Sequence, residues 1–299
     1  MISVILALIF AILSPIVYAA MNVIDKYVLA HKVKVTLSWA AVAGVVSLLF
    51  GVILALFLKW DGITLKALLF PASAGTLIGF SFFLYYLTMK EEDASHVTGL
   101  IYTYPVLVAI LSFVFLGEVI SVVSYIGMAL TLLGVIMLSV RIKKIKVKAS
   151  IWMIALMILI VALNEFFIKV ATTNISALNG TAVNMIFMGI VASSILFNGK
   201  IRKGFAYELK NVRFSFLGVT MSLLGLLTLY LAMTALPATI VSSVAAIQPL
   251  IVLFFERIAH KKLGKITRDT EILPKLIPIC LIVIGVILLY APEIIKALG

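Results

Sequence analysis

The chain has 299 residues, of which 64% are hydrophobic and 12% are charged, and its mean hydropathy is +1.26. A soluble domain is about half apolar and about a quarter charged, so this composition excludes a soluble protein and predicts a chain that lies mostly in lipid. The net charge of +12 does not indicate nucleic-acid binding, because the basic residues lie in short links between apolar runs, a pattern that reports membrane topology.

Ten apolar runs follow one another along the chain, and each is long enough to cross a bilayer as a helix of about 20 residues. Helices are expected because backbone groups in lipid must bond within their own segment. A β-barrel is not expected, since apolar and polar residues do not alternate. The first run lacks a basic start and a cleavage site, so we expect a retained helix and not a signal peptide. The runs are Ser3–Asn22, Leu37–Leu58, Ala67–Met89, Ser95–Phe115, Val122–Val140, Ile151–Val170, Ala177–Phe197, Phe214–Thr234, Ala238–Phe255 and Leu276–Tyr290.

The second half of the chain repeats features of the first in the same order. Five runs in each half is an odd number, so the halves would enter the membrane from opposite sides. The prediction is an all-α polytopic membrane protein with ten transmembrane helices in two inverted five-helix repeats, the architecture of many secondary transporters. The alternative is a chance match between two segments rich in Leu, Ile and Val. The matching pairs are Tyr86 with Tyr230, Met89 with Met233, Ala94 with Ala238, and Pro105 with Pro249.

The run YTYPVLVAILSFVFLGE at Tyr102–Glu118, followed by YIGMALTLLGVIML, resembles the repeat of the EamA family in the drug/metabolite transporter superfamily. The resemblance covers nearly the whole chain, as one repeat in residues 1–146 and a second in 147–299. It is weaker in the second half, where Glu256 lies closer to Pro249 than Glu118 does to Pro105. It implies a transporter of small metabolites with a cavity lined by the first, third, fourth, sixth, eighth and ninth helices, the fifth and tenth lying outside it.

Most Lys and Arg residues fall in links on one side of the predicted membrane. The positive-inside rule places this side in the cytoplasm and both termini outside, whereas the family resemblance implies termini in the cytoplasm. Either orientation makes this a multi-pass protein of the cytoplasmic membrane. The links Arg141–Lys148 and Arg257–Lys275 are expected to contact anionic lipid headgroups.

Two pairs of charged residues stand out, one within an apolar run and one directly after a run. An ionisable side chain inside a membrane helix costs about 2.5–3.5 kcal/mol on insertion scales, so it normally faces protein or water. Glu165 lies deep in the sixth run, and Lys169 is four residues later on the same helix face, where the two can pair. We expect this pair to bind substrate or a proton, the alternative being a structural ion pair. Asp25 and Lys26 follow the first run and are expected at a helix end in water, the alternative being a substrate-binding or proton-coupling cluster near the cavity.

The remaining candidates are polar side chains near the two prolines and tyrosines that correspond in the two halves. Tyrosine offers a ring face and one hydroxyl to a substrate of mixed polarity, although an interfacial aromatic belt is the alternative. Pro105 and Pro249 are expected to bend their helices. Small polar residues also join helices without binding anything. The predicted substrate-binding residues are Asn22, Tyr86, Thr98, Tyr102, Asn164, Glu165, Lys169, Tyr230, Ser243 and Gln248.

Other residues are expected to be structural. Glu118 ends the fourth run at the membrane edge, and Gly127 and Gly134 allow close helix packing. The single cysteine, Cys280, excludes an internal disulfide and a thiolate metal site. His31, His96 and His260 show no ligand spacing, so neither a metal nor a cofactor is expected.

The most direct interpretation is a secondary transporter of a small metabolite, an amino acid or a similar polar or amphipathic solute, that works by alternating access. A carrier of lipid-linked or amphipathic molecules and a non-transporting membrane scaffold are the alternatives. No Walker loop, dinucleotide fingerprint or HExxH motif is present, so an ATP-driven pump and an enzyme are not expected. The expected partners are a small-molecule substrate, membrane lipid and, through the outer helices, a second copy of the chain.

Overall fold

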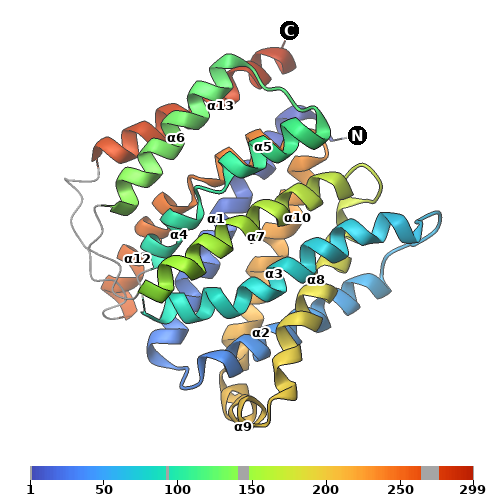
Figure 1. The fold of residues 1–299 in the computed structure, drawn as a ribbon, viewed down its shortest axis with the longest axis vertical. Coiled ribbons are helices and arrows are strands. Elements are labelled where there is room, and N and C mark those ends of the chain that lie inside the picture. Colours follow the sequence, from blue (N-terminus) through green and yellow to red (C-terminus); the bar gives the residue numbers. More distant parts are fainter. Residues whose placement is uncertain (1, 92–93, 141–147, 264–275, 299) are drawn as a thin grey trace.

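The computed structural model describes residues 2–91, 94–140, 148–263 and 276–298, and within these ranges every regular element is a helix (Figure 1). In the described part of the chain, nine stretches are long and apolar enough to cross a membrane, and Val122–Met137 is a shorter apolar helix. The prediction of an all-helical polytopic membrane protein is therefore confirmed.

The helices follow the predicted runs closely, with one addition, the short helix α9. The first half contains α1 (Val4–His31), α2 (Thr36–Leu56), α3 (Leu65–Glu91), α4 (Ala94–Ile101), α5 (Pro105–Leu116) and α6 (Val122–Val140). The second half contains α7 (Lys148–Ala171), α8 (Ala177–Ser194), α9 (Gly199–Glu208), α10 (Val212–Met233), α11 (Ala238–Ala245), α12 (Gln248–Leu263) and α13 (Leu276–Leu298), with short 3-10 turns at Ile195–Phe197 and Leu209–Asn211.

Helix α1 extends well past the predicted end of the first run, and this corrects the position expected for Asp25 and Lys26. Both residues lie inside the helix and are buried, with 5% and 7% of their surface exposed. The Lys26 ammonium donates to the carbonyl of Met89, 2.9 Å away, in the last turn of α3. Carbonyls at a helix C-terminus carry partial negative charge, which stabilises a buried cation.

Two of the predicted runs are broken into two helices each, where bends were expected. The first break, at residues 102–104, separates α4 from α5, and Pro105 is the first residue of α5. The second break, at residues 246–247, separates α11 from α12, whose second residue is Pro249. Proline has no N–H to donate to the preceding turn and its ring clashes there, so each helix restarts at or beside its proline.

Glycines let several helices approach each other closely. A Cβ at Gly75 of α3 would collide with the main-chain oxygen of Asn184 in α8, and one at Gly127 of α6 would lie 2.6 Å from the carbonyl of Gly285 in α13. Gly134 faces Pro278 of α13 in the same way. The close packing expected at Gly127 and Gly134 is thus confirmed, and α6 and α13 form a pair at one edge of the molecule (Figure 1).

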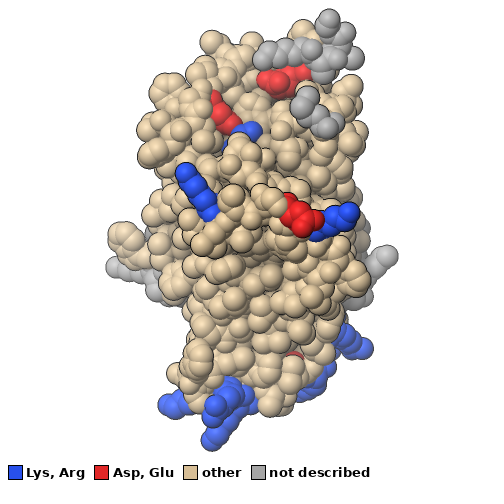
Figure 2. All heavy atoms as spheres, turned by 90° about the vertical axis from the view of Figure 1, so that its right-hand side faces the viewer, with Lys and Arg blue, Asp and Glu red and all other residues tan. Residues whose placement is uncertain are grey.

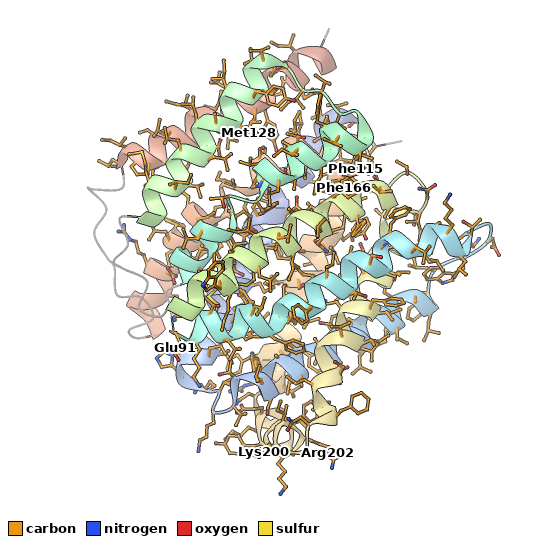
Figure 3. All side chains as sticks on the ribbon, in the orientation of Figure 1. Glu91, Phe115, Met128, Phe166, Lys200 and Arg202 are labelled. Atoms are coloured by element: carbon orange, nitrogen blue, oxygen red, sulfur yellow. The ribbon has the colours of Figure 1, made fainter. Side chains whose placement is uncertain are left out.

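The face shown in Figure 2 is uncharged over most of its area, with several Lys and Arg side chains at its lower end and a few side chains of both charges higher up. Large side chains such as Leu56, Phe57 and Ile287 are exposed by 78%, 84% and 61%. A soluble protein would bury a continuous apolar surface of this extent, so these side chains face lipid. The lower end is formed by α9, from which Lys200 and Arg202 project (Figure 3).

Helix α9 is fastened to the start of α2. The Asn198 side chain caps its first turn by accepting from the Lys200 N–H at 3.0 Å. At its other end, buried Glu208 accepts from the N–H groups of Lys34 and Val35 at 2.8 and 3.0 Å, immediately before α2 begins. The link between α1 and α2 and the link between α8 and α10 therefore lie on the same side of the molecule.

Glu118 joins three segments on the opposite side. One carboxylate oxygen accepts from the N–H of Ala238, the first residue of α11, at 2.9 Å. The other lies 3.4 Å from the ammonium of Lys169, near the end of α7. The structural role expected for Glu118 is borne out, since its side chain caps α11 and pairs with α7.

We expect Glu118→Ala to lower the free energy of unfolding by about 1–3 kcal/mol, because the first amide of α11 would lose its acceptor and the ammonium of Lys169 would lose its ion pair. Thermal unfolding of purified protein in detergent measures the effect. Glu91→Ala is the matched control, since Glu91 is exposed at the end of α3 (Figure 3). Equal unfolding temperatures for the two variants would contradict the capping role.

Candidate functional site

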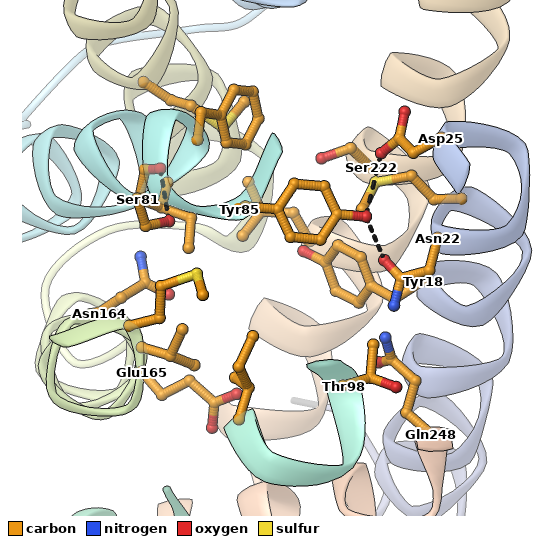
Figure 4. A pocket seen from close by; sticks show the side chains of 18 of the residues that line it. Tyr18, Asn22, Asp25, Ser81, Tyr85, Thr98, Asn164, Glu165, Ser222 and Gln248 are labelled. Atoms are coloured by element: carbon orange, nitrogen blue, oxygen red, sulfur yellow. Dashed lines mark hydrogen bonds between the residues drawn. The ribbon is translucent and has the colours of Figure 1, made fainter. Parts of the chain in front are cut away.

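A cavity of about 150 Å³ lies between the two halves of the chain (Figure 4). A cavity of roughly this size holds a group as large as benzene. Its walls come from α1, α3, α4, α7, α8, α10 and α12. Helix α8, which corresponds to the seventh predicted run, is an addition to the helices that the family resemblance implies. The polar lining residues are Tyr18, Asn22, Asp25, Ser81, Tyr85, Tyr86, Thr98, Tyr102, Asn164, Glu165, Asn184, Ser222 and Gln248.

One wall carries Asp25, held in place by α3. The Tyr85 hydroxyl of α3 lies 3.0 Å from Asn22 Oδ1 and 3.2 Å from Asp25 Oδ2, so it can donate to either (Figure 4). Asn22 and Asp25 are three residues apart on α1 and therefore share the face that meets α3. Tyr18, one turn earlier on this face, packs its ring against Gly225 of α10.

The facing wall carries Glu165, on α7. One carboxylate oxygen, Oε1, accepts from the Tyr104 hydroxyl, while Oε2 is buried with no hydrogen-bond partner among the described residues. Asn164 donates from Nδ2 to the carbonyl of Ala74 at 2.9 Å, which fixes the rotation of α7 against α3. The Asn184 side chain is also buried, next to the Tyr230 hydroxyl, and neither group makes a hydrogen bond of normal geometry within the described ranges. Asp25 and Glu165 lie on opposite sides of the cavity (Figure 4).

The two helix breaks meet at the cavity. Tyr102 lies in the break between α4 and α5, and its hydroxyl donates to Oε1 of Gln248, the first residue of α12. Thr98, which also lines the cavity, donates to the carbonyl of Ala94 at 2.8 Å. The Tyr102–Gln248 hydrogen bond joins residues 146 positions apart in the chain and so connects the two halves directly.

Seven of the ten predicted binding residues line the cavity, and the structure places the other three elsewhere. Lys169 does not pair with Glu165. Its ammonium donates to the carbonyls of Met233 and Leu236 at 2.9 and 2.8 Å, because a lysine near a helix end can reach the carbonyls that end the neighbouring helix. Tyr230 is fully buried beside Gly180. Ser243 donates to the carbonyl of Thr239 in its own helix at 2.6 Å.

Several lining residues were not predicted. Tyr18 and Asp25 carry a detectable signal, since with Asn22 they form an i, i+4, i+7 series on one face of α1. The predicted first run ends at Asn22, so Asp25 falls outside it and the series is not recognised. Tyr85 directly precedes the predicted Tyr86, and the structure brings both side chains to the cavity. Asn184 lies in a run without ionisable residues or repeat matches, and Ser222 is one of several small polar residues in its run, so no local signal marks either of them.

The lining has a defined chemical character. Its polar atoms are carboxylates, amides and hydroxyls, and none of the described residues that line it is Lys, Arg or His. In the described residues no group of three or more His, Cys, Asp or Glu side chains is placed to hold a metal ion. The cavity therefore suits a neutral or positively charged organic solute better than an anion.

Comparison with known proteins agrees with the fold. Residues 5–140 match the model of the EamA-like transporter family. This part of the chain belongs to that family. Its members are membrane transporters of the drug/metabolite type, as the resemblance of the first half implied. A search of curated proteins found no match.

A solved crystal structure has the same fold over almost the full length. It aligns with a TM-score of 0.67 at 13% sequence identity, covering 96% of this chain and 97% of the other. At this identity the likeness concerns the fold alone. The aligned region extends beyond residues 5–140, so the likeness in fold includes both halves of the chain.

Proposed function

We propose that this EamA-like protein is a secondary transporter that moves a small metabolite through the central cavity by alternating access. The observation that carries the proposal is the cavity itself, which both halves build and which contains a buried acid from each half. A buried carboxylate in a membrane helix is costly and marks a site for a substrate or an ion by default. A scaffold without a substrate would gain nothing from two such groups.

The substrate class is inferred from the unpartnered atoms. Glu165 Oε2 is a buried polar atom that lacks a protein partner within the described ranges, and the Asn184 amide is buried beside the Tyr230 hydroxyl without a hydrogen bond of normal geometry. An unsatisfied buried polar group costs about 1–3 kcal/mol. A bound amino group would supply donors to Glu165, and a neighbouring polar group of the solute would bond Asn184. A solute with an amino group, such as an amino acid or a similar amine, fits both. The cavity volume favours it over a lipid-linked cargo.

Alternating access requires two halves that exchange roles, and the packing supports such a relation. Helix α1 packs on α10 as α7 packs on α3, and α4 packs on α12 as α11 packs on α5. Lys26 bonds the carbonyl of Met89, and Lys169 bonds that of Met233. These pairs exchange when the halves are interchanged, as inverted repeats require. The proposed boundary between residues 146 and 147 lies outside the described residues.

The broken helices are the proposed gates. Each break sits beside the cavity, and the Tyr102–Gln248 hydrogen bond closes one against the other. Irregular backbone at membrane depth is tolerated where it lines a cavity, and it can rearrange without disturbing a continuous helix. Opening this bond would let the half-helices separate on one side while the other side stays packed.

The orientation is inferred from the charged links. Those of α1–α2 and α8–α10, joined by Glu208, carry the exposed cations Lys200, Arg202, Lys203, Lys210 and Arg213. The opposite side includes the α2–α3 link, whose Lys59 carbonyl accepts from Asn179. By the positive-inside rule the basic side is cytoplasmic and both termini are outside. Cysteine labelling of intact cells at exposed positions of α9 would test this, and labelling from outside would reverse it.

The transport proposal is tested by a thermal-shift screen of the purified protein against amino acids, amines, nucleosides, sugars and lipid headgroup precursors. A ligand at 100 times its dissociation constant stabilises a protein by about 2.7 kcal/mol, so a weak substrate is detectable. We expect a shift with amines or amino acids. Shifts confined to anions would contradict the proposed solute. No shift with any soluble compound would favour the lipid carrier instead.

A further inference from the structure

A second, much smaller chamber adjoins the cavity at Asp25. Its volume is about 10 Å³, and it lies where α1, α2, α3 and α10 meet. It shares Met21, Asp25, Phe82, Tyr86 and Ser222 with the central cavity, so Asp25 stands at the junction of the two spaces. The residues that line only the small chamber are Trp39, Ala43, Ser215, Gly218 and Val219.

The small chamber lies on the basic side of Asp25. Trp39 is in the first turn of α2 and Ser215 in the first turn of α10, and both helices begin at the basic links described above. The Asp25 carboxyl has one oxygen toward each space. Oδ2 lies 3.2 Å from the Tyr85 hydroxyl, which lines the central cavity, whereas a Cβ at Gly218 would lie 3.7 Å from Oδ1. Oδ1 is therefore the oxygen that faces α10 and the small chamber.

Two polar atoms of this chamber have no protein partner in the described part of the chain. They are the indole nitrogen of Trp39 and the hydroxyl of Ser215, whose side chains are only 1% and 3% exposed. A space of about 10–15 Å³ with two to four polar partners is what one buried water molecule needs. The Trp39 N–H, the Ser215 and Ser222 hydroxyls and the Asp25 carboxyl provide those partners.

We propose that this chamber is a water site through which Asp25 exchanges a proton with the basic side of the membrane. The O–H bond of the protonated carboxyl breaks, the proton passes to the water oxygen, and the carboxylate and a hydronium ion result. The hydronium proton then leaves between the first turns of α2 and α10. Uptake is the reverse. The water donates to Oδ1 and accepts from Trp39, while Ser215 continues the path.

The groups around Asp25 suit a proton site. Tyr85 and Tyr86 face it from α3, Glu165 lies across the cavity on α7, and the only neighbouring cation along α1, Lys26, bonds the Met89 carbonyl. From α2 and α10 the chamber presents only uncharged side chains. A proton is thus the cation that can reach Asp25 from the basic side. The proton site itself does not depend on the proposed transport. Only its role, which is to couple solute movement to a proton gradient, rests on that proposal.

The test uses Trp39 as a reporter and needs no substrate. The chain has three tryptophans, so Trp60→Phe with Trp152→Phe leaves Trp39 alone. Its fluorescence is recorded from about pH 4 to pH 9, the range in which buried carboxyls titrate. We expect a sigmoidal change that is lost when Asp25→Asn is added and kept with the control Glu91→Gln. A flat curve, or a curve that persists in Asp25→Asn, would overturn the proposal.

Ser215→Ala, made in the variant that keeps only Trp39, tests the water path. It also provides an independent test if Asp25→Asn does not fold. Removing the hydroxyl deletes one partner of the water, so the midpoint of the fluorescence titration should shift. An unchanged midpoint would reject the water link. Because no solute is present, a negative result here leaves the thermal-shift screen unaffected, and the two proposals fail separately.

Discussion

Glu165→Gln is expected to abolish transport and to weaken solute binding by about 10- to 100-fold while leaving the protein folded. Glu165 is 5% exposed, accepts from Tyr104 through one oxygen, and keeps the other free for the solute within the described structure. A hydrogen bond to a charged group contributes about 1.5–3 kcal/mol, and each 1.4 kcal/mol is a tenfold change in affinity. Glutamine retains the bond from Tyr104 but offers an amine no charge.

The measurement combines two readouts on the solute that gives the largest thermal shift. Binding is followed by isothermal titration, and transport by uptake into proteoliposomes. Glu91→Gln makes the same chemical change at an exposed position and should behave as the unmodified protein. Unchanged affinity and uptake in Glu165→Gln would remove Glu165 from the site and, with it, the inferred amine.

The second large effect is expected from Gly75→Ala, which should lower the free energy of unfolding by about 1–3 kcal/mol. The added Cβ would collide with the main-chain oxygen of Asn184. The oxygen is a backbone atom of α8, and an alanine Cβ is fixed rigidly to the backbone of α3, so neither can move away as the end of a flexible side chain would. The helices α3 and α8 must separate, and the collision falls at a residue that lines the cavity.

Gly199→Ala is the matched control, because no atom lies within 4 Å of the position its Cβ would occupy. It should unfold at the temperature of the unmodified protein. We further expect Gly75→Ala to reduce solute binding at a temperature where it is still folded, since the Asn184 amide is displaced. Normal stability in Gly75→Ala would mean that the two helices do not pack as described.

Only part of the candidate site could be predicted from the sequence. Glu165 was found because ionisable residues are rare in apolar runs, and Gln248 because it lies beside Pro249. Tyr86 and Pro105 were found because each has a counterpart in the second half. Lys169 was misassigned for a physical reason. Its spacing from Glu165 allows a pair on one helix, but the carbonyls of Met233 and Leu236 and the carboxylate of Glu118 lie within reach from other segments.

The sequence by itself determined that the protein is helical and lies in a membrane. Composition suffices for this, because lipid offers no hydrogen bonds to the backbone and leaves a long apolar run little choice but a helix. The proline positions likewise marked where two of these helices break, since the missing N–H acts locally.

Only the tertiary structure decided which face of each helix looks inward. In a soluble protein the apolar stripe of a helix reveals its buried face. Helices such as α8 and α10 are apolar on nearly all sides. Positions that face lipid and positions that face the core therefore have the same hydrophobic character in the sequence. Asp25 meets Tyr85 across 60 residues and shares its small chamber with Trp39 and Ser215. Such groupings depend on how whole helices pack, and no local pattern records them.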